Sequence, residues 1–313
     1  MSRATSQGLV SGGLGVVLNT SRRHATISDN RRSTKAGTIA SRSVSLLVGD
    51  KVDFHEEAGQ LFISAGHERK NTLSRSYRGD TKPIVSNVDL LLVVTAVPPL
   101  LNTLSVDRMG VVAHSQAIPW ALVINKIDLG LDYCAETILA YERLGIEVLR
   151  TAAKFGPGLD ELRTLLENSS LETVVLCGLS GVGKSTLINR LIPEASRATA
   201  EVSTRTGQGK QTTSQASGFL LPRENSHGLV VVDLPGIQQF GVEHLTQVQV
   251  AEAFPEIAEY RMACEFSDCG HVFERKCAVR DAAGRGVKEG GMALSRYESY
   301  CHMCKEIEDA KPY

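Results

Sequence analysis

Nine consecutive residues near the middle of the chain limit its possible folds more than any other segment. Residues 178–186 read Gly-Leu-Ser-Gly-Val-Gly-Lys-Ser-Thr, which fits the pattern G-x-x-x-x-G-K-[ST]. An apolar run at residues 174–177 precedes them, and residues 187–191 have the composition of a helix. The backbone N–H groups of such a turn, together with the N-terminus of the helix, point at a bound anion. The segment therefore predicts a phosphate-binding loop between a strand and a helix of an α/β domain.

Two side chains of this loop and one acid further along suit a nucleoside triphosphate with Mg²⁺. Lys184 can reach the β- and γ-phosphates, and Ser185 can offer its hydroxyl to Mg²⁺. Residues 230–236 read Val-Val-Val-Asp-Leu-Pro-Gly, so Asp233 ends an apolar strand, where it can hold Mg²⁺ through water. The N–H of Gly236 can then face the γ-phosphate.

The segment between these motifs, residues 204–217, is rich in Gly, Thr and Gln. A nucleotide switch needs a loop that becomes ordered around the γ-phosphate and Mg²⁺. Thr212 or Thr213 can supply the hydroxyl for that contact. The alternative is an ordinary flexible linker.

A guanine selector is expected at residues 125–128, Asn-Lys-Ile-Asp, which follow an apolar run at residues 120–124. Asp128 can accept hydrogen bonds from N1–H and the 2-amino group of guanine; adenine has neither donor, so the buried carboxylate would stay unpaired. Asn125 can tie this segment to the phosphate loop, and the stem of Lys126 can cover the base. The selector precedes the phosphate loop, which reverses the usual order. The sequence therefore predicts a circularly permuted P-loop GTPase domain, because function depends on where residues meet rather than on their order in the chain.

The first part of the chain has a different pattern of apolar and polar residues. Short apolar stretches broken by Gly, Asn and Ser predict a small β-barrel, and a polar, basic connection is expected after it, at residues 69–82. The predicted strand segments are residues 15–18, 43–48, 51–54 and 60–64. Residues 1–48 carry seven Arg and Lys side chains against one acid, Asp29. That end can meet a polyanion or can simply be solvated. The net charge of −1 excludes a chain that is basic throughout.

Five of the seven cysteines lie after residue 263. Cys264, Cys269, His271 and Cys277 form a complete tetrahedral Zn²⁺ set with no open position, which predicts a structural site. Cys301 and Cys304 lie in an expected helix and lack two further partners, so unliganded cysteines are favoured there. No run of 18–20 apolar residues and no signal-peptide core is present, so a cytoplasmic protein with no membrane partner is expected.

Taken together, these segments resemble the RsgA (YjeQ/EngC) family of circularly permuted small-subunit biogenesis GTPases along nearly the whole chain. The matching segments are residues 48–52, 69–75, 86–89, 233–241, 264–279 and 296–300. The resemblance implies a multidomain chain: an N-terminal OB-fold β-barrel (1–75), a central circularly permuted P-loop GTPase α/β domain (76–245) and a C-terminal zinc-binding helical domain (246–313).

The function implied by this resemblance is a ribosome-dependent GTPase. It would act late in maturation of the small (30S) ribosomal subunit, bind rRNA and help to release other assembly factors. The barrel face suits rRNA, and the expected phosphate contacts are Arg22, Arg23, Arg31 and Arg32. A monomer is expected.

The expected ligands are GTP or GDP with Mg²⁺, and one structural Zn²⁺. Catalysis is expected from Gln211 and Thr213, and Mg²⁺ ligation from Ser185, Thr213 and Asp233. The expected GTP-binding residues are Asn125, Lys126, Ile127, Asp128, Ala153, Lys154, Gly178, Leu179, Ser180, Gly181, Val182, Gly183, Lys184, Ser185, Thr186, Thr212, Asp233 and Gly236.

Several positions depart from the family pattern. Gln211 replaces a histidine, Leu234 replaces a threonine, and Ala152 replaces the serine of a Ser-Ala-Lys segment. Glutamine can orient a water molecule, so Gln211 can substitute for histidine or hydrolysis is slower. Ile237 stands where Ras-like proteins carry a catalytic glutamine, which predicts slow intrinsic hydrolysis that the ribosome accelerates.

These departures keep a rival hypothesis open: a GTP-regulated rRNA-binding module in which hydrolysis is minor. A zinc and OB-fold nucleic-acid protein unrelated to ribosomes is a second rival. Use of ATP is a third, and Asp128 opposes it.

Overall fold

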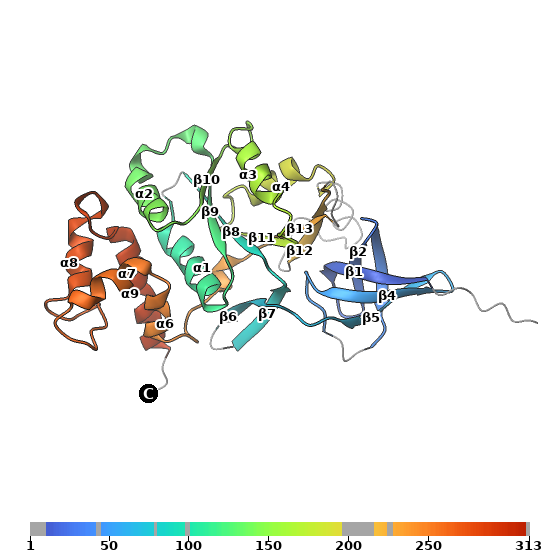
Figure 1. The fold of residues 1–313 in the computed structure, drawn as a ribbon, viewed down its shortest axis with the longest axis horizontal. Coiled ribbons are helices and arrows are strands. Elements are labelled where there is room, and N and C mark those ends of the chain that lie inside the picture. The colour runs from blue at the N-terminus through green and yellow to red at the C-terminus, as the bar shows by residue number, and fades with distance from the viewer. Residues whose placement is uncertain are drawn as a thin grey trace, which may run out of the picture.

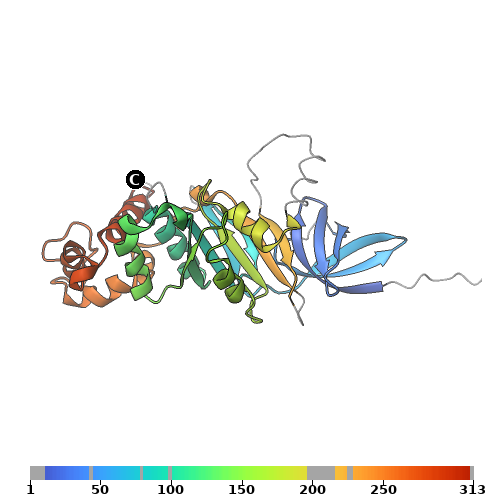
Figure 2. The ribbon, with the colours of Figure 1, turned by 90° about the horizontal axis from the view of Figure 1, so that it is seen from above.

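Three parts lie in a row in the computed structural model, which describes residues 11–41, 45–77, 80–97, 101–195, 216–223 and 228–310. The β-barrel is at one end, an α/β sheet with its helices is in the middle, and a helical lobe is at the other end (Figures 1 and 2). Within the described residues, no helix has the length and apolar character needed to cross a membrane.

The N-terminal part is a closed barrel of five strands, as the sequence predicted. The strands follow the order β1-β2-β3-β5-β4, and all neighbours are antiparallel except β3 and β5. Alternate residues such as Val17, Ile27 and Ile63 are fully buried inside, as the two-residue period of a strand requires. The bounds are β1 (Ser11–Thr20), β2 (His24–Asp29), β3 (Thr34–Ile39), β4 (Lys51–Glu57) and β5 (Gln60–Gly66).

Two strands of the barrel, β2 and β3, were not among the predicted segments, because their Thr- and Ser-rich sequences contain few apolar residues. The strand predicted at residues 43–48 is wrong over its described part. Residues 45–47 form no strand, and Val48 makes only an isolated bridge to Val85. The apolar residues of this segment pack into the core without forming a strand: Leu46 and Val48 are buried in two different hydrophobic clusters.

A two-stranded hairpin, β6 (Thr72–Tyr77) and β7 (Asp80–Ser86), joins the barrel to the sheet. The polar, basic connection predicted at residues 69–82 forms β6 and the start of β7, and Leu73 within it is fully buried. The buried carboxylate of Asp50 fixes the hairpin to the barrel, accepting hydrogen bonds from Ser86 Oγ at 2.6 Å and Arg69 Nε at 2.7 Å. The domain boundary expected between residues 75 and 76 falls within β6.

The central sheet has the strand order β10-β9-β8-β11-β13-β12, in which only β12 is antiparallel to its neighbour. Every residue of β8 and β11 is buried, because helices cover both faces. Helices α1 and α2 pack into one hydrophobic cluster, and α3 and α4 into the other. The strands are β8 (Leu90–Ala96), β9 (Trp120–Asn125), β10 (Val148–Thr151), β11 (Thr173–Cys177), β12 (Ser217–Leu221) and β13 (Leu229–Leu234). The helices are α1 (Thr103–Ser115), η1 (Ile127–Leu129), η2 (Asp132–Cys134), α2 (Ala135–Arg143), α3 (Leu159–Leu166), α4 (Lys184–Leu191) and η3 (Ile237–Gln239).

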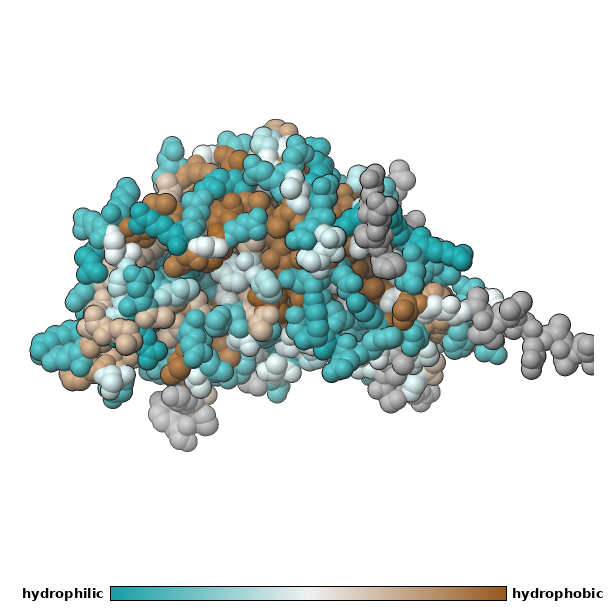
Figure 3. Space-filling view, viewed as in Figure 1, coloured by the Kyte–Doolittle hydropathy of each residue, from teal (hydrophilic) through white to brown (hydrophobic). Residues whose placement is uncertain are grey.

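The C-terminal lobe is helical, as predicted: α6 (Gln247–Glu252), α7 (Pro255–Tyr260), η4 (Arg261–Ala263), α8 (Ala278–Arg285), η5 (Val287–Glu289) and α9 (Leu294–Asp309). On the face shown in Figure 3, hydrophilic side chains predominate, and moderately apolar ones gather over this lobe. The lobe contributes five of the eight large apolar residues that are exposed in the described chain: Val248, Met262, Phe266, Phe273 and Leu294.

A buried cation joins this lobe to the α/β part. Arg296 of α9 is 2% exposed and lies between the rings of Tyr141 and Phe254, 4.9 and 4.8 Å from their centroids. It pairs with Asp107 of α1 and Glu256 of α7. Burial alone would lower the pKa of Arg296, but the two carboxylates outweigh burial and raise this pKa. Burial raises the pKa of Asp107, and the charge on Arg296 opposes that shift. Asp107 Oδ2 is buried and has no hydrogen-bond partner among the described residues.

Candidate nucleotide and metal sites

Most of the predicted nucleotide-site residues come together at one edge of the sheet. The carboxyl ends of β9, β10, β11 and β13 share that edge, and the register pairs Asn125 with Thr151 and Cys177 with Leu234. From β8 the chain continues to β9 on one side of the sheet, whereas from β11 it continues to β12 and β13 on the other side. The gap between β8 and β11 is therefore a topological switch point, the usual position of a ligand crevice in an open α/β sheet. The motif at residues 178–186 follows β11, and the motifs at 125–128 and 233–236 begin in the last residues of β9 and β13.

Asn125 holds three of these segments together. Its Nδ2 donates to the carbonyl of Val182 in the phosphate loop at 2.9 Å. Its Oδ1 accepts from Thr151 Oγ1 at 3.1 Å and from the backbone N–H of Ala153 at 3.0 Å. Asn125 is 2% exposed, so these bonds are shielded from water. The link to the phosphate loop is the one the sequence predicted. We call residues 152–158, which follow β10, the base loop.

Two positions of the phosphate loop require glycine because neighbouring strands approach the backbone closely there. A Cβ on Gly183 would lie 2.2 Å from Asn125 Nδ2, and the φ of +100° is itself unfavourable for other residues. A Cβ on Gly178 would lie 2.1 Å from the carbonyl oxygen of Val94 in β8. The glycine pattern therefore reflects packing of the loop on β8 and β9 as well as the space that a phosphate needs.

Lys184 and Asp233 form the charged part of the site. Lys184 Nζ donates to the carbonyls of Gly178 and Leu179, at 2.8 and 3.1 Å. Burial lowers the pKa of Lys184 and raises that of Asp233, and each group's charge partly opposes the shift of the other. Asp233 Oδ1 is buried and has no hydrogen-bond partner among the described residues. A buried carboxylate oxygen without a partner suits a hydrated Mg²⁺, so the donor set fits this ion.

The remaining predicted residues are placed as follows. Asp128 lies in η1 and is exposed, and Lys126 before it has the left-handed φ of +64°. Ser185 and Thr186 are exposed in the first turn of α4, and Gly236 is exposed beyond β13. Lys154 is exposed next to the buried Ala153. Ile127, Leu179, Ser180, Gly181 and Val182 lie on the same two loops. Gln211, Thr212 and Thr213 lie outside the described residues.

Sequence reasoning missed Thr151, whose hydroxyl reaches Asn125. No motif includes this residue. The available signal was its position, because it is a polar residue that ends a short strand and is completely buried. Such a residue at the carboxyl edge of a parallel sheet is a candidate for supporting a ligand-binding loop.

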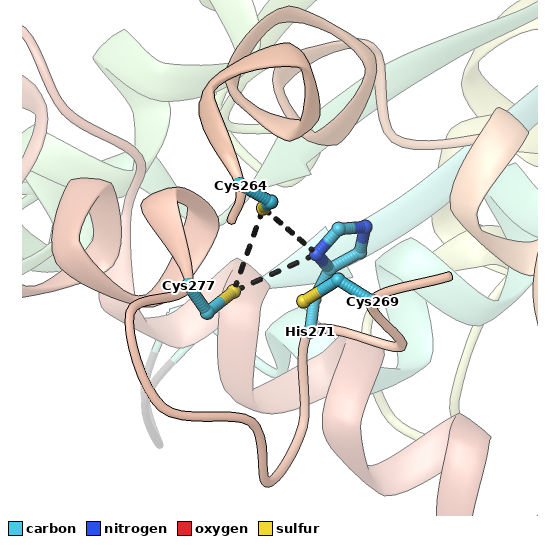
Figure 4. A group of neighbouring side chains, drawn as sticks. All are labelled: Cys264, Cys269, His271 and Cys277. Carbon is cyan, nitrogen blue, oxygen red and sulfur yellow. Dashed lines mark hydrogen bonds between the residues drawn. The ribbon is translucent and has the colours of Figure 1, made fainter. Parts of the chain in front are cut away.

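The four predicted metal ligands also converge, with all their ligand atoms within 4.8 Å of one another (Figure 4). His271 Nδ1 lies 3.5 Å from the sulfurs of both Cys264 and Cys277, which are 4.0 Å apart. A tetrahedral zinc ion with ordinary bond lengths would separate S and N by about 3.5 Å and two S atoms by about 3.8 Å. The cluster therefore fits zinc. Cys301 and Cys304 lie on α9 and are not part of this cluster.

Neighbouring side chains fix the zinc loop. The Glu274 carboxylate accepts hydrogen bonds from the N–H groups of Gly270, Val272 and Phe273, at 2.7–3.0 Å. Tyr297 and Tyr300 of α9 donate to the carbonyls of His271 and Gly270, both at 2.9 Å. Such contacts orient the ligands of a metal before it binds.

Comparison with known proteins agrees with these features. The family described as RsgA GTPase matches residues 66–243. The "Small ribosomal subunit biogenesis GTPase RsgA" of Haemophilus influenzae (strain 86-028NP) is 32% identical over 307 residues, covering 95% of this chain and 86% of that protein. The protein of the same name from Actinobacillus succinogenes is 33% identical over 292 residues, covering 90% of this chain and 78% of that protein.

Two solved structures share the fold. YjeQ from Thermotoga maritima aligns with a TM-score of 0.71 and 28% identity, over 95% of this chain and 99% of that one. YloQ, described as a circularly permuted GTPase, aligns with a TM-score of 0.65 and 26% identity over the full length of both chains. The family match spans more than half of the chain, and the relatives align along nearly all of it. The chain therefore belongs to the RsgA GTPase family and is a GTP-hydrolysing enzyme.

Proposed function

We propose that this GTPase acts late in maturation of the small ribosomal subunit, and that binding to the subunit completes its active site. The observation that carries the proposal is the joining of the guanine-selector strand, the base loop and the phosphate loop through Asn125, within a chain whose curated relatives are named small ribosomal subunit biogenesis GTPases. The protein works as a cytoplasmic monomer on rRNA, divided into functional parts at residues 1–75, 76–245 and 246–313.

Each part of GTP has a proposed partner in the chain. Asp128 accepts hydrogen bonds from guanine, and Lys126 and Lys154 flank the base. The N–H groups of residues 178–186 surround the phosphates, and Lys184 exchanges its contacts with the carbonyls of Gly178 and Leu179 for phosphate oxygens. Ser185, Thr213 and Asp233 hold Mg²⁺, which when bound neutralises charge on the phosphates. Gln211 orients the attacking water.

The residue after Gly236 supports slow hydrolysis by the isolated protein. Ile237 is apolar and 4% exposed, so it offers no polar group to a water molecule at that position. The missing catalytic assistance would come from the ribosomal subunit. The same observation favours the second candidate function, a GTP-regulated rRNA-binding module in which hydrolysis is minor.

The barrel provides the proposed rRNA contacts. Arg22 and Arg23 lie exposed in the β1–β2 turn, and Arg31 and Arg32 lie exposed in the β2–β3 turn. Arginines at exposed turns of a barrel suit phosphate contacts. Zinc holds the C-terminal lobe in shape and takes no part in hydrolysis, because its four ligands leave no open position.

GTP turnover by the purified protein, with and without purified small subunits, tests this proposal. We expect low turnover alone, strong stimulation by small subunits and none by large subunits. Equal turnover under all three conditions would contradict a subunit-completed active site. GTP binding and nucleotide-dependent subunit binding without stimulation would favour the regulated-binding function.

A further inference from the structure

Arg190, in the last turn of the phosphate-loop helix α4, extends to the base loop. Its guanidinium donates to the carbonyl of Lys154 at 2.5 Å. A hydrogen bond from a charged donor is shorter and stronger than a neutral one. Through this bond the helix that starts at the phosphates is joined, at its far end, to the loop beside the base.

The base loop has few other attachments outside itself. Three backbone bonds close it internally: Ala152 N–H to Pro157, and Phe155 and Gly156 N–H to Ala152, all at 2.9 Å. Ala152 has no polar side chain with which to anchor it. Within the described residues, its hydrogen bonds to segments other than the adjoining helix α3 are that of the Ala153 N–H to Asn125 and that of Arg190 to the Lys154 carbonyl.

The two attachments differ in the side of the loop that they hold. Asn125 fixes Ala153, at the buried root of the loop, where Ala153 is 2% exposed. Arg190 fixes the next residue, whose side chain is exposed. The ammonium of Lys154 lies 5.3 Å from the centroid of the Phe155 ring, and Phe155 is 64% exposed. Among the described residues, only its internal turn would hold the outer half of the loop by hydrogen bonds without Arg190.

We propose that Arg190 is a positioning residue for guanine: it holds the outer half of the base loop in register with the phosphate loop, and so sets the affinity for the base. The proposal rests on the nucleotide site proposed above. It assigns to α4 a second function at its C-terminal end, separate from phosphate binding at its N-terminal end.

Arg190→Met tests the proposal because methionine keeps much of the aliphatic stem and removes every donor. We expect the Kd for GDP to rise about three- to tenfold, the size of one lost charge-assisted hydrogen bond at an exposed site. Affinity for inorganic tripolyphosphate, which has no base, should stay within about twofold. Because substrate positioning is lost and chemistry is not, KM for GTP should rise while kcat at saturation stays unchanged. Arg190→Lys should recover part of the affinity, since an ammonium can also donate to a carbonyl.

Arg163→Ala is the matched control. Arg163 donates to the carbonyl of Arg190 at 3.3 Å and pairs with Asp160, and neither of these bonds reaches the base loop. An unchanged Kd for GDP in Arg190→Met would overturn the proposal. So would equal losses for GDP and tripolyphosphate, or a loss matched by Arg163→Ala, since these would indicate a charge effect or a general effect on helix packing. Should the wild type bind no guanine nucleotide at all, the proposed nucleotide site itself would fail, and this inference with it.

Discussion

The metal cluster and the nucleotide site are built in opposite ways. All four metal ligands lie within residues 264–277, and the turns between them bring the ligand atoms within 4.8 Å of one another. The nucleotide site draws on segments near residues 125, 152, 178 and 233, which meet only when five strands have paired. A local cluster depends on its ion, whereas a distributed site depends on the core of its domain. The two should therefore fail independently.

Zinc removal should have the largest effect and should be confined to the C-terminal lobe. Structural zinc sites contribute apparent binding free energies of about 10–16 kcal/mol. Chelation, or Cys277→Ser, should abolish stoichiometric zinc and make residues 246–310 sensitive to protease. The Kd for GDP should stay within about threefold, because no zinc ligand lies on a nucleotide loop. Parallel loss of zinc and of GDP affinity would show that the sites are coupled.

Lys184→Met should damage only the nucleotide site. We expect GTP turnover to fall by at least about a hundredfold, since the charge that we propose binds the phosphates is lost. The free energy of unfolding should not decrease, because burial already disfavours the ammonium, as the lowered pKa of Lys184 indicates. Single-turnover hydrolysis and urea unfolding measure the two quantities. Retained turnover would remove Lys184 from the site.

The junction between the two regions should give a pH-dependent stability. Burial raises the pKa of Asp107 from 3.8 to about 6, despite Arg296. The folded state thus binds a proton more tightly than the unfolded state, so Asp107 costs stability as the pH rises between those values, by about 3 kcal/mol in full. The free energy of unfolding of wild type minus that of Asp107→Asn should be larger at pH 4.5 than at pH 7.5. Urea titrations at both pH values check this, with the 98% exposed Asp160 changed to Asn as a surface control. A constant difference would contradict the assignment.

Asn125→Ala should show how far the distributed site depends on one side chain. The substitution leaves the Val182 carbonyl and the Ala153 N–H without their partners, at about 1–3 kcal/mol for each buried group. We expect the Kd for GDP, measured by calorimetry, to rise about tenfold or more. Gly183→Ala is a matched variant, because its Cβ would lie 2.2 Å from Asn125 Nδ2. Unchanged GDP affinity in both variants would mean that Asn125 only packs the core.

The same contrast explains what could be predicted from sequence. The metal ligands could be found from spacing alone, and strands β8, β9, β11 and β13 from apolar runs, because both signals are local. Strands β2 and β3 and the β6–β7 hairpin contain few apolar residues, so no run marks them, and the apolar run of β12 is only three residues long. Neither Thr151 nor Arg190 belongs to a motif. Their partners lie 26 and 36 positions away in the chain, which only the folded sheet brings close.

The Arg296 network was also beyond sequence reasoning. Its contact with Asp107 spans 189 positions and joins two domains. A charged residue on a helix is by default expected at the surface, and nothing in the local pattern of α9 distinguishes this arginine from an exposed one. Packing between domains decided its burial.

The measurement that tests the central claim most directly is the nucleotide preference of Asp128→Asn. If the segment after β9 reads guanine, an asparagine at this position should weaken GDP binding by at least about tenfold and should improve binding of xanthosine diphosphate, whose 2-oxo group accepts the hydrogen bond that an amide donates. Calorimetry with both nucleotides gives the two Kd values. A variant that still prefers GDP as strongly as the wild type would show that the base is bound elsewhere, and the site assembled around Asn125 would have to be reassigned.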